Sequence, residues 1–138
     1  MEEIKRKLTL HLRLVKLDNS GIYPPILLCE LLKHKGFSNC KLKQGFISLA
    51  NEGHCWHLWI ENGDQVIDIN HEIACRLNEY FRKLQFDLST EKPEKYDKDD
   101  ASVELWELYN QDKKKFWKEQ PMKVQNFRSK MFNKVFKN

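Results

Sequence analysis

Hydrophobic and polar residues alternate near the beginning of the chain, with leucine at every second position: Leu8, Leu10, Leu12 and Leu14. This period of two favours a β-strand, in which successive side chains point to opposite faces. Leu10, Leu14 and Leu17 also fit one face of a helix, so the helical alternative stays open here. The segment ends at a predicted turn, Asp18-Asn19-Ser20-Gly21.

A helix is predicted after this turn. Pro24-Pro25 suits a first helical turn, where backbone N–H groups need no partner within the helix. The helix would run through Lys33 and end at Gly36, because glycine readily adopts the left-handed backbone angles that close a helix. The residues that follow, Leu42–Leu49, are expected to form a strand.

Two further strand-like runs, Cys55–Ile60 and Gln65–Ile69, flank an Asn62-Gly63 pair. Asn-Gly between such runs is typical of a two-residue hairpin turn, because both turn residues take positive φ. In that register Trp59 lies opposite Val66. The opposite face of the hairpin is apolar: Trp56, Leu58, Ile60, Ile67 and Ile69. A one-residue shift of the register would move these side chains to the other face, so the apolar pattern disfavours it.

The same register has a chemical consequence. It places His57 directly opposite Asp68, with β-carbons about 4.5–5.5 Å apart. A carboxylate at that distance can orient the imidazole and stabilise its protonated form, which is the support that a catalytic base needs in a nucleophilic triad. A purely structural hydrogen bond is the alternative.

Helical spacing dominates the second half of the chain. Residues 71–84 are predicted to be helical, and the polar stretch Ser89–Asp100 is predicted to be a loop. Two more helices are expected, one over Ala101–Glu119 and one from Pro121 onward. The chain is therefore predicted to be an α+β protein with additional C-terminal helices.

A length of 138 residues predicts a single domain, 1–138. The longest apolar run, Ile26–Cys29, is far too short to span a membrane, and the N-terminus lacks the pattern of a secretory signal. We therefore expect a cytoplasmic protein without a membrane segment. The cysteines have no Cys-x-x-Cys spacing, so no zinc site, other metal site or disulfide framework is predicted: Cys29, Cys40, Cys55 and Cys75.

Charge is distributed unevenly. Residues 87–104 carry a net charge of −4, within a predicted polar loop over 87–100, and residues 110–138 carry +7. A basic tail is typical of proteins that bind nucleic acid, an acidic protein or an anionic surface, or it is the solvated face of helices. The neighbouring aromatic residues are expected to be core residues rather than platforms for bases: Trp106, Phe116, Trp117 and Phe127.

The hairpin resembles that of the transglutaminase-like domains of the papain-like thiol superfamily. His57-Leu58-Trp59, a short turn and Val66-Ile67-Asp68 match the family's His-x-Trp…Asp pattern, preceded by the helix that ends at Gly36 and a strand with Gly45-Phe46. The resemblance covers about 19–70 and implies a helix packed on an antiparallel sheet, with 71–138 as a helical addition. It also implies acyl transfer from an amide or thioester by a Cys-His-Asp triad without metal or organic cofactor.

The resemblance implies His57 as base, Asp68 as its orienting residue and Trp59 as a wall of the substrate site. The thiol of the family opens the helix, and the matching positions here, around Ser20–Tyr23, contain no cysteine. Cys29, within the helix, is the candidate nucleophile, with a core residue as the alternative. Cys55 shares the predicted face of His57 and is assigned to the substrate site, and Cys40 and Cys75 have weaker claims.

Two functions follow from these observations. The first is a cysteine-dependent amide hydrolase or acyltransferase that acts on a protein or peptide substrate. The second is a catalytically inactive transglutaminase-like binding protein that uses the cleft or the basic C-terminal helices to hold a protein or nucleic-acid partner. The sequence leaves the oligomeric state and the acyl acceptor open.

Overall fold

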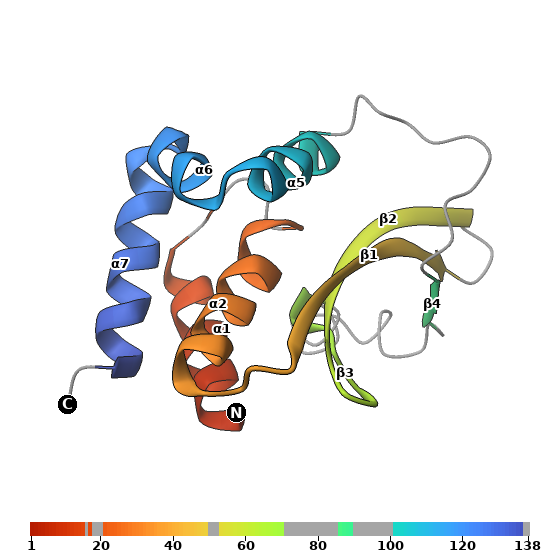
Figure 1. Cartoon of the computed structure of the whole chain (residues 1–138), viewed down its shortest axis with the longest axis horizontal. Helices are drawn as coiled ribbons and strands as arrows, with labels where there is room; N and C mark the ends of the chain where they lie inside the picture. Colours follow the sequence, from red (N-terminus) through yellow and green to blue (C-terminus); the bar gives the residue numbers. More distant parts are fainter. Residues whose placement is uncertain (16, 18–20, 50–52, 71–85, 90–100, 137–138) are drawn as a thin grey trace.

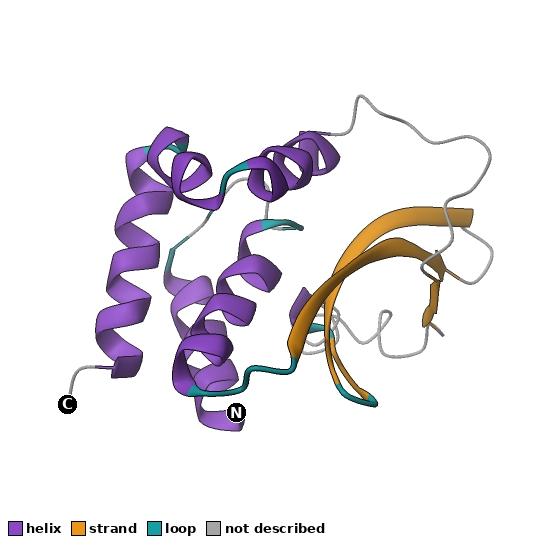
Figure 2. Cartoon of the chain, viewed as in Figure 1, coloured by secondary structure: helices purple, strands orange, loops and turns teal. Residues whose placement is uncertain are grey.

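A computed structural model describes residues 1–15, 17, 21–49, 53–70, 86–89 and 101–136, with only the backbone of 46–49, 53–55, 86–89 and 101–102. Within these residues the protein is α+β, as predicted, and helices gather on one side of a curved antiparallel sheet (Figures 1 and 2). One apolar core joins the two layers and includes residues from Ile4 to Met131. No described helix is long and apolar enough to cross a membrane.

The N-terminal segment is a helix, α1 (Glu2–Leu14), so the strand prediction was wrong. Its buried face contains Ile4 and Leu8, four residues apart, whereas Leu10 and Leu14 are exposed. The alternation of leucines spans only the second half of the element. Helix-forming residues begin at Glu2, and ion pairs one turn apart, such as Glu3 with Lys7 at 3.3 Å, support a helical period over the whole segment.

The central helix is α2 (Tyr23–Lys35), and its prediction is confirmed. Pro24 and Pro25 lie in its first turn, where they remove no intrahelical hydrogen bond. Gly36 ends the helix at φ +117°, and its N–H donates to the carbonyl of Lys33 at 3.1 Å. Almost every side chain before Glu30 is buried, because α2 packs between the sheet and α1 and α7 (Met122–Phe136).

The sheet has the strand order β3-β2-β1-β4, and each described pair is antiparallel. The long strands β1 (Cys40–Leu49) and β2 (Gly53–Asn62) pair along their whole length and form the centre. The predicted strand over Leu42–Leu49 is confirmed as part of β1. β4 (Phe86–Ser89) pairs with the end of β1, although residues 87–89 were expected to lie in a loop.

The hairpin exists, but its turn lies one residue further along than predicted. β3 (Gln65–Ile67) pairs with β2 so that Asn62 faces Gln65 and Glu61 faces Val66. The turn residues are therefore Gly63 and Asp64, with Gly63 at φ +61° in the first turn position, which needs positive φ. Moving the turn by one residue shifts the register by two, and a two-residue shift leaves every side chain on its predicted face.

The predicted apolar face of the hairpin is confirmed. Leu58, Ile60 and Ile67 are at most 1% exposed and belong to the core shared with the helices. The pattern that resists a one-residue slip therefore determines which face the helices cover. The helix predicted over 71–84 and the loop over 90–100 lie outside the described residues.

The predicted helix over Ala101–Glu119 is two helices, α5 (Ala101–Gln111) and α6 (Lys113–Glu119). Asp112 separates them, because its extended backbone begins a new helix and its side chain accepts a hydrogen bond from the N–H of Lys115 at 3.0 Å. The helix predicted from Pro121 is confirmed as α7. The aromatic residues of this region are core residues, as expected, with 2–7% exposure: Trp106, Phe116, Trp117 and Phe127.

Two glycines with positive φ, Gly36 and Gly63, provide a test of the fold. We expect Gly36→Asn to lower the free energy of unfolding by about 1–2 kcal/mol, because φ +117° is strained for any side chain, whereas Gly63→Asn at φ +61° changes it by less than about 0.5 kcal/mol. No atom lies within 4 Å of an added β-carbon at either site, so backbone strain alone is compared. Urea unfolding measures both, and equal losses would contradict the assignment.

Candidate functional site

The structure brings His57 and Asp68 together. Nε2 of His57 lies 2.6 Å from Oδ2 of Asp68, and both side chains are largely buried, at 13% and 10% exposure. In the observed register Asp68 follows β3 and is diagonal to His57 rather than directly opposite it. The contact survives because both residues remain on one face of the hairpin after the two-residue shift.

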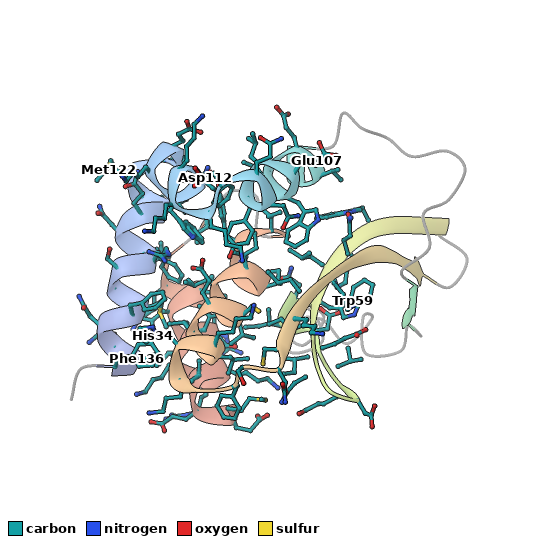
Figure 3. The ribbon with its side chains drawn as sticks, in the orientation of Figure 1. His34, Trp59, Glu107, Asp112, Met122 and Phe136 are labelled. Atoms are coloured by element: carbon teal, nitrogen blue, oxygen red, sulfur yellow. The ribbon has the colours of Figure 1, made fainter. Side chains whose placement is uncertain are left out.

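Trp59 lies beside this pair. Its ring is nearly parallel to the His57 imidazole, with 6.3 Å between ring centres, and its Nε1–H donates to Glu61 at 3.2 Å. Trp59 is only 1% exposed and does not belong to the core shared with the helices, so it packs on the sheet face away from α2 (Figure 3). In this structure Trp59 therefore offers almost no surface to a substrate.

The beginning of α2 approaches the end of the hairpin. Nδ2 of Asn70 donates to the carbonyl of Gly21 at 3.2 Å, just before the first residue of the helix, Tyr23. Gly45 of β1 lies directly across from His57, so no side chain of that cross-strand partner covers the imidazole. The helix start and the His57–Asp68 pair are thus neighbours in the fold.

Cys29 lies elsewhere. It is in the middle of α2, 2% exposed, and belongs to the core on the helix side of the sheet. Its Sγ–H donates to the carbonyl of Cys40 at 3.9 Å. Strand alternation places His57 on the opposite face from Leu58, which shares that core, so the sheet separates the Cys29 thiol from the imidazole.

The electrostatic environment of Cys29 also disfavours a thiolate. Burial raises the pKa of its thiol to about 11, and the nearby charge of Lys33 opposes this only in part. A nucleophilic cysteine needs the opposite shift. The burial of Cys40 likewise raises its pKa. Cys55 is a β2 residue paired with Ile47, and its side chain and the whole of Cys75 lie outside the described part of the chain.

A hollow of about 890 Å³ lies on the helix side. Its walls come from the second half of α2, the strand segment Lys41–Lys43, the inner side of α5 and the residues Arg128 and Phe132 of α7. A second cavity of about 360 Å³ lies between α6 and α7 and shares Glu30, Lys113 and Arg128 with the first. We call the two together the basic groove.

Glu30 lies between the two cavities, and its carboxylate is bound from three helices. Oε2 accepts from the Tyr109 hydroxyl at 2.9 Å and from Nε1 of Trp117 at 3.0 Å, and Oε1 accepts from Nε of Arg128 at 3.1 Å. Burial raises the pKa of Tyr109, and the Glu30 charge raises it further, so Tyr109 remains a donor. Glu30 is not among the predicted site residues, although a single carboxylate within an apolar helix signals such a site.

Charge in the basic groove is one-sided. The helices supply one carboxylate, Glu30, which is paired with Arg128, and four lysines besides: Lys33, Lys113, Lys114 and Lys118. Lys41 and Lys43 alternate with Leu42, which packs on the helix-side core, so strand geometry directs their side chains to the other face. The groove is therefore suited to an anionic partner.

No protein-family model, curated protein or solved structure matches this chain. Among the described residues no group of three or more His, Cys, Asp or Glu side chains could hold a metal ion. The two candidate sites that the described residues form are the His57–Asp68 pair and the basic groove.

The burial of Cys29 predicts its reactivity. At about pH 8, alkylation of Cys29 by iodoacetamide in the native protein should be about 100-fold slower than in urea, because a pKa near 11 instead of 9.0 reduces the thiolate fraction by that factor. Peptide mapping of the alkylated protein measures each cysteine, and His57→Ala should leave the profile of Cys29 unchanged. Rapid labelling near neutral pH that is lost in His57→Ala would instead identify a thiolate–imidazolium pair.

The Glu30 cluster predicts a stability effect. Glu30→Ala should lower the free energy of unfolding by about 2–3 kcal/mol, because it leaves the buried donors of Tyr109 and Trp117 without an acceptor. Glu30→Gln keeps an acceptor and should lose less. Chemical unfolding followed by tryptophan fluorescence measures both, and equal stability of the alanine variant and the parent would contradict this role.

Proposed function

We propose that this chain is a non-catalytic binding protein on a transglutaminase-like hairpin scaffold, and that its basic groove holds an acidic segment of a partner protein. The observation that carries the proposal is the charge balance of the groove, five Lys and Arg side chains on helices against one carboxylate, Glu30, which is paired with one of the five, Arg128. Such a surface attracts anionic segments and aligns them through long-range electrostatics.

The scaffold part of the proposal is supported by the neighbourhood of the His57–Asp68 pair. The contact between Asn70 and Gly21 holds the start of α2 beside the hairpin, which is where the thiol lies in the family that the hairpin resembles. The helix begins with Ile22 and Tyr23 at that place. A thiol-dependent family member that has lost its nucleophile would have this arrangement.

A thiol hydrolase or acyltransferase is the second candidate, and the 2.6 Å contact between His57 and Asp68 favours it. It requires a nucleophile next to the imidazole. Cys29 is buried on the other side of the sheet with a raised pKa, so this candidate depends on a cysteine other than Cys29. The mapping of thiol reactivity described above distinguishes the two candidates.

A protein partner is favoured over nucleic acid because the aromatic rings that α5 and α6 contribute to the groove are not available for stacking. Trp106, Tyr109 and Trp117 are at most 7% exposed. Proteins that bind single strands without sequence preference present aromatic side chains on which bases stack. The ring of Phe132 on α7 is partly buried, with its centre 4.9 Å from the guanidinium carbon of Arg128. The basic groove therefore offers charge with largely covered rings, which suits carboxylates on an extended peptide.

Binding of an acidic peptide tests the proposal. A fluorescein-labelled decaglutamate peptide should bind, and its affinity should fall as salt rises from about 50 to about 300 mM, because exposed charges are screened. The double variant Lys114→Glu/Lys118→Glu should bind about tenfold more weakly. Fluorescence anisotropy measures both affinities.

The matched control is Lys123→Glu/Lys130→Glu. It changes the net charge by the same amount at exposed positions of α7 that line neither cavity, so affinity should change by less than about threefold. Equal losses in the two double variants would indicate nonspecific attraction and contradict a groove. Tight binding of a thymidine decanucleotide without binding of decaglutamate would favour nucleic acid instead.

A further inference from the structure

Arg128 is held in one orientation at the junction of the two cavities. Its Nε–H donates to Oε1 of Glu30 at 3.1 Å, and its guanidinium carbon lies 4.9 Å from the ring centres of both Trp117 and Phe132. An arginine that is bonded at Nε and stacked on aromatic rings has lost most of its rotational freedom before a ligand arrives. Glu30, Trp117 and Phe132 are thus positioning residues for this guanidinium.

The terminal N–H groups of the Arg128 guanidinium remain available for a ligand. Glu30 uses the Nε–H, and within the described part of the chain no other hydrogen-bond acceptor contacts the guanidinium. The side chain is 33% exposed and lines both cavities. The N–H groups of its terminal nitrogens form a planar fork that matches two oxygens of one oxyanion.

Lys113 supplies a second cation at the same junction. It also lines both cavities, and its Nζ lies 5.6 Å from the centre of the Tyr109 ring, which forms part of the groove floor. Lys113 forms no ion pair with any described carboxylate; the nearest ion pairs in this region are Lys115 with Glu119 and Arg128 with Glu30. The terminal N–H groups of Arg128 and the ammonium group of Lys113 therefore border the same two cavities.

We propose that Arg128 and Lys113 bind a phosphomonoester on the acidic partner, so that the basic groove recognises a phosphorylated serine or threonine. This inference rests on the proposed function of the groove as a site for an acidic protein segment. A phosphomonoester carries a charge of about −1.5 to −2 and three acceptor oxygens near neutral pH. Two of these oxygens match the fork of Arg128, and the third matches the ammonium of Lys113, whereas a carboxylate has only two oxygens and one charge.

Three labelled peptides test the proposal, each with the sequence Gly-Glu-Gly-X-Gly-Glu-Gly, where X is serine, phosphoserine or glutamate. The wild-type protein should bind the phosphoserine peptide about tenfold more tightly than the serine peptide, with the glutamate peptide between them. Arg128→Lys keeps the charge but removes the fork, so the preference for phosphoserine over serine should fall to about twofold. Lys130→Ala, on the same helix outside both cavities, should keep the full preference.

A measurement on the unaltered protein guards against misfolding of the variant. The Arg128 Nε–H resonance in a nitrogen–proton NMR spectrum should shift on titration with the phosphoserine peptide and stay in place with the serine peptide. Equal affinities of wild type for these two peptides would overturn the phosphate assignment. If decaglutamate still bound in that case, the proposed function would stand, whereas loss of binding to every acidic peptide would overturn both.

Discussion

The partly buried carboxylate of Glu30 constrains the packing of α5, α6 and α7 on the central helix α2. It is the only acidic side chain on α2, and its neighbours along the helix are buried apolar residues. A carboxylate in that position is unfavourable unless donors reach it, and Tyr109, Trp117 and Arg128 supply them from three different helices. One charged group therefore links α5, α6 and α7 to the central helix, beside the apolar core that these helices share with it.

The same arrangement creates the groove. The donors to Glu30 come from α5, α6 and α7, so these helices lie around the second half of α2. Cavities of about 890 and 360 Å³ remain between them and α2. Asp112 contributes by ending α5 and starting α6, and the lysines of α6 follow directly. The positive charge of the C-terminal residues is thereby gathered on a concave surface, although along the sequence it resembles the solvated face of ordinary helices.

The sheet separates this groove from the His57–Asp68 pair. Side chains of one strand alternate between its faces, so the residues that pack under α2 and the residues beside His57 belong to different surfaces of the same two strands. Cys29 lies on the helix side, where burial raises its pKa to about 11. The separation of the Cys29 thiol from His57 and its raised pKa have the same cause: Cys29 lies on α2 in the apolar core between the helix and the sheet.

The sequence alone determined where α2 begins and ends, through its prolines and its closing glycine. It also determined which hairpin side chains share a face. It placed His57 beside Asp68 as well, because a period of two survives a register error of two residues. The apolar pattern indicated which face of the sheet is covered, but only tertiary packing decided that α2, with Cys29, covers that face and that Cys29 and His57 therefore lie apart. Tertiary packing alone united Glu30 with Tyr109 and Arg128, which are 79 and 98 residues away along the chain. Periodicity describes neighbours within an element, whereas such contacts depend on how distant elements supply donors to one partly buried charge.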